Sequence, residues 1–293
     1  MKPTIRRKKL GEKSTKIIIK LVFLSFLVVF IITLIRIISS SIFFQKKDHI
    51  QLVVYGKHTS FFSFGFRDGI NYGLYVSPDD MVDVPGGYGV YRFGALGKLI
   101  NLEKDPKLLL KTFSSTTGSF VDLYLSEGTG DIYYGDDQTL KPRLPTVAEI
   151  LFNESNMNVL ERLYILSYIV RQNENVVKVL RYSPTFADEY QGFFFDPVFR
   201  KERLNVQIIY SKSYKSALKL SQIIEGEGIR VGDIIVSSER KPSCAIFENT
   251  DKHTYSAKAL ARFFNCPLKK GKTGGYDIIF MLGDRENDWF ISE

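Results

Sequence analysis

The stretch between Val76 and Leu99, VSPDDMVDVPGGYGVYRFGALGKL, holds the residues whose types and spacing could do chemistry. Asp79, Asp80 and Asp83 supply carboxylates, which hold divalent cations such as Mg²⁺ or act as general bases. Arg92 follows a glycine-rich bend, and its guanidinium could bind a phosphate through charge-assisted hydrogen bonds. Residues of these types at this spacing would suit phosphate chemistry.

Each of these candidates also has a purely structural interpretation. Aspartates are frequent turn formers because their side chains bond to nearby backbone, so the run from Asp79 to Asp83 could be a solvated turn. Arg92 could pair with one of these aspartates instead of a ligand. The residue directly after Pro78 is Asp79, where a phosphate site would favour Arg or Lys. Whether the stretch is an active site or the remains of one stays open at this point.

Few other residues have a spacing that indicates chemistry. The three histidines, His49, His58 and His253, are isolated in sequence, and none has a triad-like spacing with Ser or Asp. The segment Lys269–Gly275, KKGKTGG, is similar to a phosphate-binding loop but lacks the full glycine-lysine pattern and precedes a predicted strand rather than a helix. We expect it to be a basic surface loop that could touch an anionic polymer.

Two cysteines, Cys244 and Cys266, are too few to form a disulfide framework in a chain of 293 residues. The sequence favours two separate buried thiols, with pairing as the alternative. No Cys-x-x-Cys or histidine-rich spacing occurs, which argues against a structural zinc site.

Alternating strands and helices are predicted around these residues. Runs rich in β-branched and aromatic residues predict strands at 50–55, 60–66, 72–77, 120–126, 205–210, 229–237, 244–249 and 276–283. Apolar residues at helical spacing predict helices at 105–116, 158–171, 214–227 and 254–265. The second of these begins with a capping box formed by Asn158 and Glu161. This alternation predicts an α/β fold, with a βαββαβ order in the last ninety residues.

Between the two sets of strands, residues 181–203 read RYSPTFADEYQGFFFDPVFRKER. Two prolines and a basic end indicate a linker. The many aromatic residues indicate that this segment packs against the folded domains instead of being a solvated linker.

An apolar segment near the N-terminus predicts a transmembrane helix over residues 17–44. Residues 21–35, LVFLSFLVVFIITLI, carry no charge, and isoleucines extend the run on both sides. At 1.5 Å per residue, Ile17–Ile38 covers about 33 Å, enough for a hydrocarbon core of roughly 30 Å. The alternative is a cleaved signal peptide, but the apolar run is long and Ser39–Ser41 is a poor cleavage site.

The positive charge of the chain is confined to its N-terminal part. Residues 1–50 hold eleven basic and two acidic residues, a local charge of +9, whereas the whole chain carries +8. Residues 1–16 are therefore a basic tail, which favours a cytoplasmic N-terminus and an extracytoplasmic remainder. The rest is close to neutral, so the sequence argues against nucleic acid as a partner. A regulator acting through the tail is disfavoured because sixteen residues are too few for a DNA-binding domain.

The last ninety residues resemble the LytR C-terminal domain. The matching segments are NVQIIYSKS, YKSALKLSQIIEGEGI, CAIFENT, YSAKALARFFNCP and DIIFMLGD, between residues 205 and 284. In that family a strand leads to an alanine-rich helix with a glycine stop, then to further strands and an "A-x-x-L-A" helix.

Residues 50–180 resemble, more faintly, the LytR–CpsA–Psr (LCP) domain, which follows a single membrane anchor. The segment 76–86 is similar to the family stretch "IPRDT-x-V-x-IPG", and 91–96 is similar to its "K-I-N-x-A-Y" stretch. The segments 108–125 and 159–164 are similar to its later helix–strand element and its "R-x-x-R-Q-Q" helix.

This resemblance implies transfer of a phosphorylated glycopolymer from a polyprenyl-pyrophosphate carrier to the cell wall, with arginines on the pyrophosphate and carboxylates on a divalent cation. The sequence departs from that pattern, because the motif arginine is Asp79 and the first arginine of the late helix is Val159. Only Arg92 and Arg162 remain as candidate phosphate ligands, although the position of Arg162 opposite the apolar face of its helix favours a solvated residue. Asp80 is the candidate catalytic base, and Asp80 and Asp83 are the candidate metal ligands.

We therefore expect two extracytoplasmic α/β domains behind a single-pass anchor in the cytoplasmic membrane. The expected boundaries are 1–16 for the tail, 17–44 for the transmembrane helix, 48–180 for a degenerate LCP-like domain, 181–203 for the linker and 204–293 for the LytR-C-like domain. The expected function is a non-catalytic binding or scaffold module in cell-wall glycopolymer attachment or envelope maintenance. Its partners would be membrane lipid, glycopolymer, polyprenyl-phosphate lipid or envelope proteins. The alternative is a divergent LCP-type phosphotransferase, which would use Mg²⁺ as its cofactor.

Overall fold

The computed structural model divides the chain into two units. One consists of Met1–Lys46 and Asn158–Tyr164, and the other of Lys47–Met157 and Ile165–Glu293. The structure describes residues 7–40, 47–128, 130–135, 141–171, 177–237 and 243–291; in the N-terminal helix, side chains are described for residues 15–35 and 38. The expected 1–16 and 17–44 segments therefore lie partly outside the described residues.

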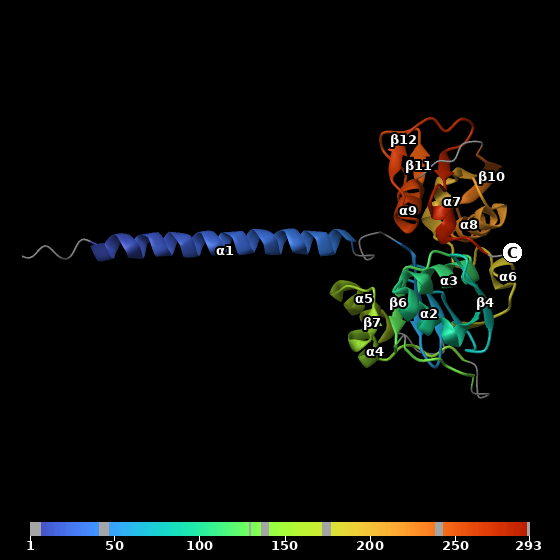
Figure 1. Cartoon of the computed structure of the whole chain (residues 1–293), viewed down its shortest axis with the longest axis horizontal. Coiled ribbons are helices and arrows are strands. Elements are labelled where there is room, and N and C mark those ends of the chain that lie inside the picture. Colours follow the sequence, from blue (N-terminus) through green and yellow to red (C-terminus); the bar gives the residue numbers. More distant parts are fainter. Residues whose placement is uncertain are drawn as a thin grey trace, which may run out of the picture. The chain divides into compact units, whose positions relative to one another are not determined.

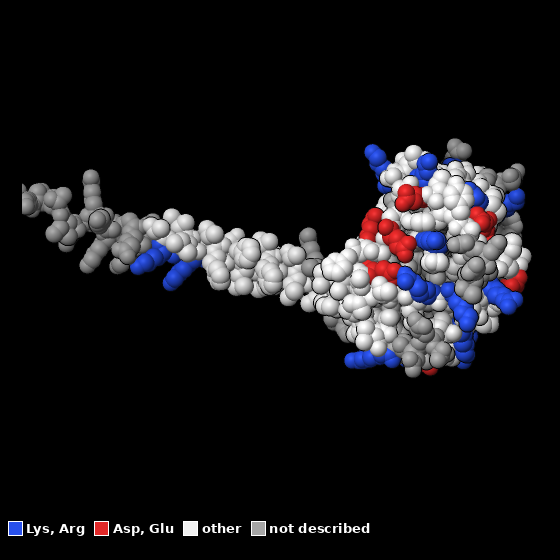
Figure 2. All heavy atoms as spheres, turned by 90° about the horizontal axis from the view of Figure 1, so that it is seen from below, with Lys and Arg blue, Asp and Glu red and all other residues white. Residues whose placement is uncertain are grey.

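The N-terminal helix α1 spans Arg7–Ser40 and contains the predicted apolar segment. Within it, the 21 residues Thr15–Ile35 have a mean hydropathy of 3.0 and are not buried. Figure 2 shows Lys and Arg on the described part of α1 only near its N-terminal end, followed by a long uncharged surface. In the described part of the chain, this is the one helix long and apolar enough to cross a membrane. The prediction of a membrane-spanning helix is confirmed to that extent.

A mixed six-stranded sheet forms the first half of the larger unit (Figure 1). Its order is β7 (Glu154–Ser155), β6 (Leu123–Ser126), β1 (His49–Tyr55), β2 (Ser60–Gly65), β3 (Asn71–Tyr75) and β8 (Val177–Arg181). Strands β1, β2 and β3 pair antiparallel, whereas β6 joins β1 and β8 joins β3 in parallel. The strands predicted at 50–55, 60–66, 72–77 and 120–126 are confirmed, whereas β8 was not predicted.

Both β1 and β2 are buried along their whole length, which explains their continuous apolar and aromatic sequences. Helices α2 (Leu96–Glu103) and α3 (Lys107–Thr117) add apolar side chains to this core. The N-cap of α3 is Pro106, and its C-cap is Gly118 in the left-handed conformation. The acidic and glycine-rich stretch folds as a β4 (Met81–Val84) and β5 (Gly89–Arg92) hairpin, which the sequence analysis interpreted only as turns and bends.

A five-stranded sheet forms the second half of the unit, in the order β10 (Arg230–Val236), β9 (Asn205–Tyr210), β13 (Ile278–Met281), β11 (Ala245–Glu248) and β12 (Leu268–Lys270). Helix α8 (Tyr214–Gly226) packs on β9 and β10, and α9 (Tyr255–Phe263) packs on β11 and β12. The predicted βαββαβ order is correct except for the additional strand β12. Lys269 and Lys270 therefore lie in an edge strand, which corrects the expectation of a surface loop at these two positions.

The two cysteines form a disulfide, which corrects the expectation of separate thiols. Cys244 lies before β11 and Cys266 lies after α9, with 5.5 Å between their Cα atoms. They are 22 residues apart in sequence, so their proximity results from the packing of α9 on β11.

The segment 181–203 is folded against both sheets, as its aromatic composition predicted. It contains the short helices α6 (Phe186–Glu189) and α7 (Pro197–Glu202). Phe194 is buried in the core of the six-stranded sheet, and Phe199 in the core of the five-stranded sheet. The remaining helices are η2 (Phe93–Ala95, a 3₁₀ turn), α4 (Val147–Phe152), α5 (Val159–Ile169) and α10 (Arg285–Asp288).

Candidate functional site

The turn after β3 carries the first candidate residues. The backbone N–H of Asp80 donates to the carbonyl of Ser77 at 3.0 Å, and the N–H of Ser77 donates to the Asp80 carboxylate at 2.9 Å. This reciprocal pair closes the turn that the Asp-rich sequence predicted. It also fixes the Asp80 side chain at the end of β3, beside the first strand of the β4–β5 hairpin.

Asp79 is held by contacts that neutralise it. One carboxylate oxygen accepts the backbone N–H of Gly135 at 3.1 Å, and the other accepts Arg92 Nη1 at 3.4 Å. The Arg92 guanidinium also lies 4.9 Å from the ring centroid of Tyr134. The structural alternative for Arg92, pairing with a nearby aspartate, is therefore the arrangement observed.

Asp80 lines a cavity of about 500 Å³. Lys141 and Arg181 line the same cavity, with Tyr75 and Tyr182 in its wall. Burial raises the pKa of Asp80 above its ordinary value, and the nearby Asp79 charge acts in the same direction. The cavity therefore combines one carboxylate of raised pKa with two cations, which could hold a phosphate.

Lys141 and Arg181 are not among the site residues predicted from the sequence. Arg181 ends β8, which pairs in parallel with β3 so that Tyr75 and Arg181 are partners in the register. The carboxyl ends of adjacent parallel strands meet at one sheet edge, where ligands commonly bind in open α/β sheets. Recognising β8 as a strand parallel to β3 would have placed Arg181 near the turn that holds Asp80.

Asp83 lines a second, smaller cavity of about 250 Å³, together with Lys219 from α8. Burial lowers the pKa of Lys219, whereas Asp188 and Asp83 act in the opposite direction. Tyr182 contributes to the walls of both cavities, and its hydroxyl donates to the Met81 carbonyl at 2.7 Å. Burial raises the pKa of Tyr182 to about 12, so this phenol stays protonated at neutral pH.

The candidate metal ligands do not converge. Among the residues that the structure describes, no group of three or more His, Cys, Asp or Glu side chains could hold a metal ion. Asp80 and Asp83 line different cavities, and the Asp79 carboxylate is engaged by Arg92 and Gly135. These residues do not fit the Mg²⁺ site that the family resemblance implied.

Arg162 belongs to the unit formed by Met1–Lys46 and Asn158–Tyr164. Its backbone N–H donates to the Asn158 carbonyl at 3.0 Å, in the first turn of α5. The predicted capping box is present, because the N–H groups of Asn158 and Glu161 each donate to the other residue's side chain, at 2.9 and 3.0 Å. Arg162 is not among the residues that line the Asp80 cavity or the Asp83 cavity.

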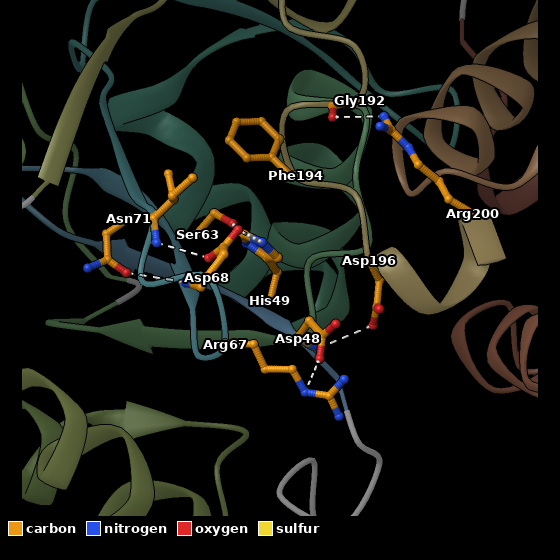
Figure 3. Close-up of polar contacts among 12 residues, drawn as sticks. Asp48, His49, Ser63, Arg67, Asp68, Asn71, Gly192, Phe194, Asp196 and Arg200 are labelled. Atoms are coloured by element: carbon orange, nitrogen blue, oxygen red, sulfur yellow. Dashed lines mark hydrogen bonds and ion pairs between the residues drawn. The ribbon is translucent and has the colours of Figure 1, made fainter.

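One histidine has partners that its sequence spacing did not indicate. His49 lies between Ser63 Oγ, 3.3 Å from its Nδ1, and Asp68 Oδ2, 3.1 Å from its Nε2 (Figure 3). Although this order is that of a catalytic triad, Ser63 is fully buried in β2 and His49 is buried as well. A buried hydroxyl cannot reach a substrate. We therefore interpret the three residues as a hydrogen-bonded group that joins β1 to β2 and to the β2–β3 turn.

No protein-family model matches this chain, and no curated protein matches it.

Proposed function

We propose that this chain is a single-pass protein of the cytoplasmic membrane and a divergent member of the LCP family. Its folded unit lies on the extracytoplasmic side, where it binds cell-wall glycopolymer without transferring it. The apolar helix Thr15–Ile35, the basic residues that precede it and the α/β architecture of the larger unit support this proposal. The two sheets would correspond to the LCP-like and LytR-C-like domains.

The non-catalytic assignment rests on the position of Asp79 and on the interactions of its carboxylate. This residue stands where the family pattern has a phosphate-binding arginine, and its carboxylate is bonded to Arg92 and to the Gly135 N–H. A carboxylate there repels a phosphate, and the pairing removes Arg92 as a free ligand. Each charged hydrogen bond lost in this way is worth roughly 1.5–3 kcal/mol.

A transfer assay with the full-length protein in lipid nanodiscs tests this function. The probes are a polyprenyl-pyrophosphate-linked glycan and isolated peptidoglycan as acceptor, with and without Mg²⁺. We expect glycopolymer to be retained on the immobilised protein while polyprenyl phosphate is not released above the level of empty nanodiscs. Release of polyprenyl phosphate by the wild-type protein would contradict the non-catalytic assignment.

The alternative is a divergent phosphotransferase, and the Asp80 cavity favours it. Lys141 and Arg181 could hold the pyrophosphate, while Asp80 could take the proton from the attacking hydroxyl. If the transfer assay is positive, Asp80→Asn should abolish turnover under this hypothesis, whereas Asp68→Asn, an exposed carboxylate outside the cavity lining, should not. Equal activity of both variants would eliminate Asp80 as the base.

A further inference from the structure

A third and larger cleft opens between the two sheets of the larger unit. It has a volume of about 720 Å³ and is lined by α3 and the end of α2 on one side, and by α9 and α10 on the other. The volume lies within the range of roughly 300–1,000 Å³ typical of small-ligand sites. Both walls belong to the same compact unit, so the cleft is a property of one folded body.

The cleft lining carries more cations than carboxylates. Its five basic residues are Lys104, Lys107, Lys111, Arg262 and Arg285, and its three carboxylates are Asp105, Asp122 and Asp288. Every one of these carboxylates is already paired: Asp105 with Lys111 at 3.5 Å, Asp288 with Arg285 at 2.8 Å, and Asp122 with Lys47.

The remaining cations therefore lack a carboxylate of their own. Lys104, Lys107 and Arg262 are exposed, and none forms an ion pair with any residue in the described ranges. Arg285 uses Nη1 to bind Asp288, while its Nε is buried and has no acceptor within the described part of the chain.

Aromatic side chains line the second-sheet side of the cleft. Phe263, Phe264 and Trp289 line it, with 6.0 Å between the ring centroids of Phe263 and Trp289. Phe263 also stacks on Phe120 at 4.2 Å, and it keeps part of its surface exposed. Stacking fixes the Phe263 ring, so the cleft presents a rigid apolar surface beside the cations.

We propose that this cleft binds an acidic saccharide, with its carboxylate or phosphate groups on Arg262 and Lys107 and a sugar ring against Phe263. Cations that are not already paired bind anions at the lowest cost, because no internal ion pair has to break. The apolar surface suits the C–H face of a sugar ring. The remainder of the chain after residue 50 is close to neutral, which argues for this local anion site over an extended polyanion groove. This inference rests on the proposed function, because it names where the glycopolymer would bind.

Binding measured by isothermal titration calorimetry on the full-length protein in nanodiscs tests the proposal. The probes are oligogalacturonate, poly(glycerol phosphate), a neutral maltooligosaccharide of matched length and inorganic phosphate. We expect oligogalacturonate to bind and the neutral sugar to bind about tenfold more weakly or not at all. Binding should also weaken as the salt concentration rises.

The decisive comparison is between two double variants. Lys107→Ala with Arg262→Ala should lower the affinity for oligogalacturonate by about tenfold or more, because two charge-assisted contacts are lost. The matched control is Lys215→Ala with Arg230→Ala, two exposed cations outside the cleft lining, which should change the affinity by less than about twofold. All four substituted side chains are exposed, so both variants should fold, which circular dichroism would verify.

Three outcomes would overturn the proposal, and they differ in what they mean for the proposed function. An equal loss of affinity for oligogalacturonate in both double variants would show that the saccharide binds outside the cleft, and the proposed binding function would still hold. In the second outcome, poly(glycerol phosphate) binds no more tightly than inorganic phosphate and oligogalacturonate does not bind. The cleft would then be a simple anion site that does not recognise a saccharide. Failure of the wild-type protein to bind any saccharide would overturn both the cleft and the binding function.

Discussion

Glu227 is a buried carboxyl group at the junction of the two sheets. Its side chain is 2% exposed, and the backbone N–H of Phe120 donates to it. Burial raises the pKa of Glu227 from 4.5 to about 8, while Lys47 and the Phe120 N–H act in the opposite direction. At neutral pH this residue is therefore mostly protonated, which makes the contact between the two sheets sensitive to pH.

The stability of the larger unit should fall as pH rises because of this residue. A carboxyl whose pKa is higher in the folded state binds more protons when the protein is folded. Its contribution to the free energy of unfolding is therefore complete below pH 4.5 and is lost as pH rises through about 8. Glu227→Gln cannot ionise and should flatten this dependence, with a difference of a few kcal/mol at the alkaline end. Urea unfolding between about pH 5 and pH 9 measures it.

The control is Glu225→Gln, two residues earlier in the chain, where the carboxylate is partly exposed and within 3.3 Å of Gln191. This variant should keep the pH dependence of the wild-type protein. A Glu227→Gln protein that loses stability with pH as steeply as the wild type would rule out the assigned role.

At the scale of elements, the two sheets are joined by a close contact between α3 and α8. Gly118 ends α3 in the left-handed conformation, and Gly226 is the last residue of α8. A Cβ added at Gly226 would overlap the backbone carbonyl oxygen of Gly118. Backbone atoms cannot move aside as the end of a flexible side chain can, so this contact requires glycine.

Gly226→Ala should therefore destabilise the larger unit by about 2 kcal/mol or more, in the range of overpacking substitutions. Differential scanning calorimetry or urea unfolding measures the loss. Gly130→Ala is the matched control, because nothing lies within 4 Å of a Cβ built there. If Gly226→Ala unfolds at the same temperature as the control, α3 and α8 do not approach each other as described.

At the scale of the whole molecule, the helix that could cross a membrane and the two sheets belong to different units. The apolar residues Thr15–Ile35 lie in one unit, whereas both sheets lie in the other. Neither sheet takes a strand from the described residues 7–40, so loss of this helix removes no strand from the larger unit.

Deleting residues 1–46 should release the protein from membranes without changing its unfolding temperature. The apolar segment of 21 residues would have to be extracted from hydrocarbon, whereas the remaining chain is close to neutral and, in its described part, holds no other helix long and apolar enough to cross a membrane. Carbonate extraction of expressed full-length and shortened proteins measures the partition. Retention of the shortened protein with membranes would show a second membrane contact on the larger unit.

The sequence by itself determined the features that depend on neighbours along the chain. The span Thr15–Ile35, the capping box at Asn158 and most strands and helices follow from hydropathy, periodicity and local hydrogen bonding. Strand β8 and the β4–β5 hairpin were missed, because these strands are only four or five residues long and no residue of β5 or β8 is buried.

Only the tertiary structure decided which distant residues meet. Arg181 reaches the Asp80 cavity through parallel pairing of β8 with β3, and Arg262 faces Lys107 through packing of the two sheets. The Cys244–Cys266 bridge likewise depends on α9 lying against β11. Sequence spacing carries no information about such contacts, because they depend on sheet order and on how the whole core packs.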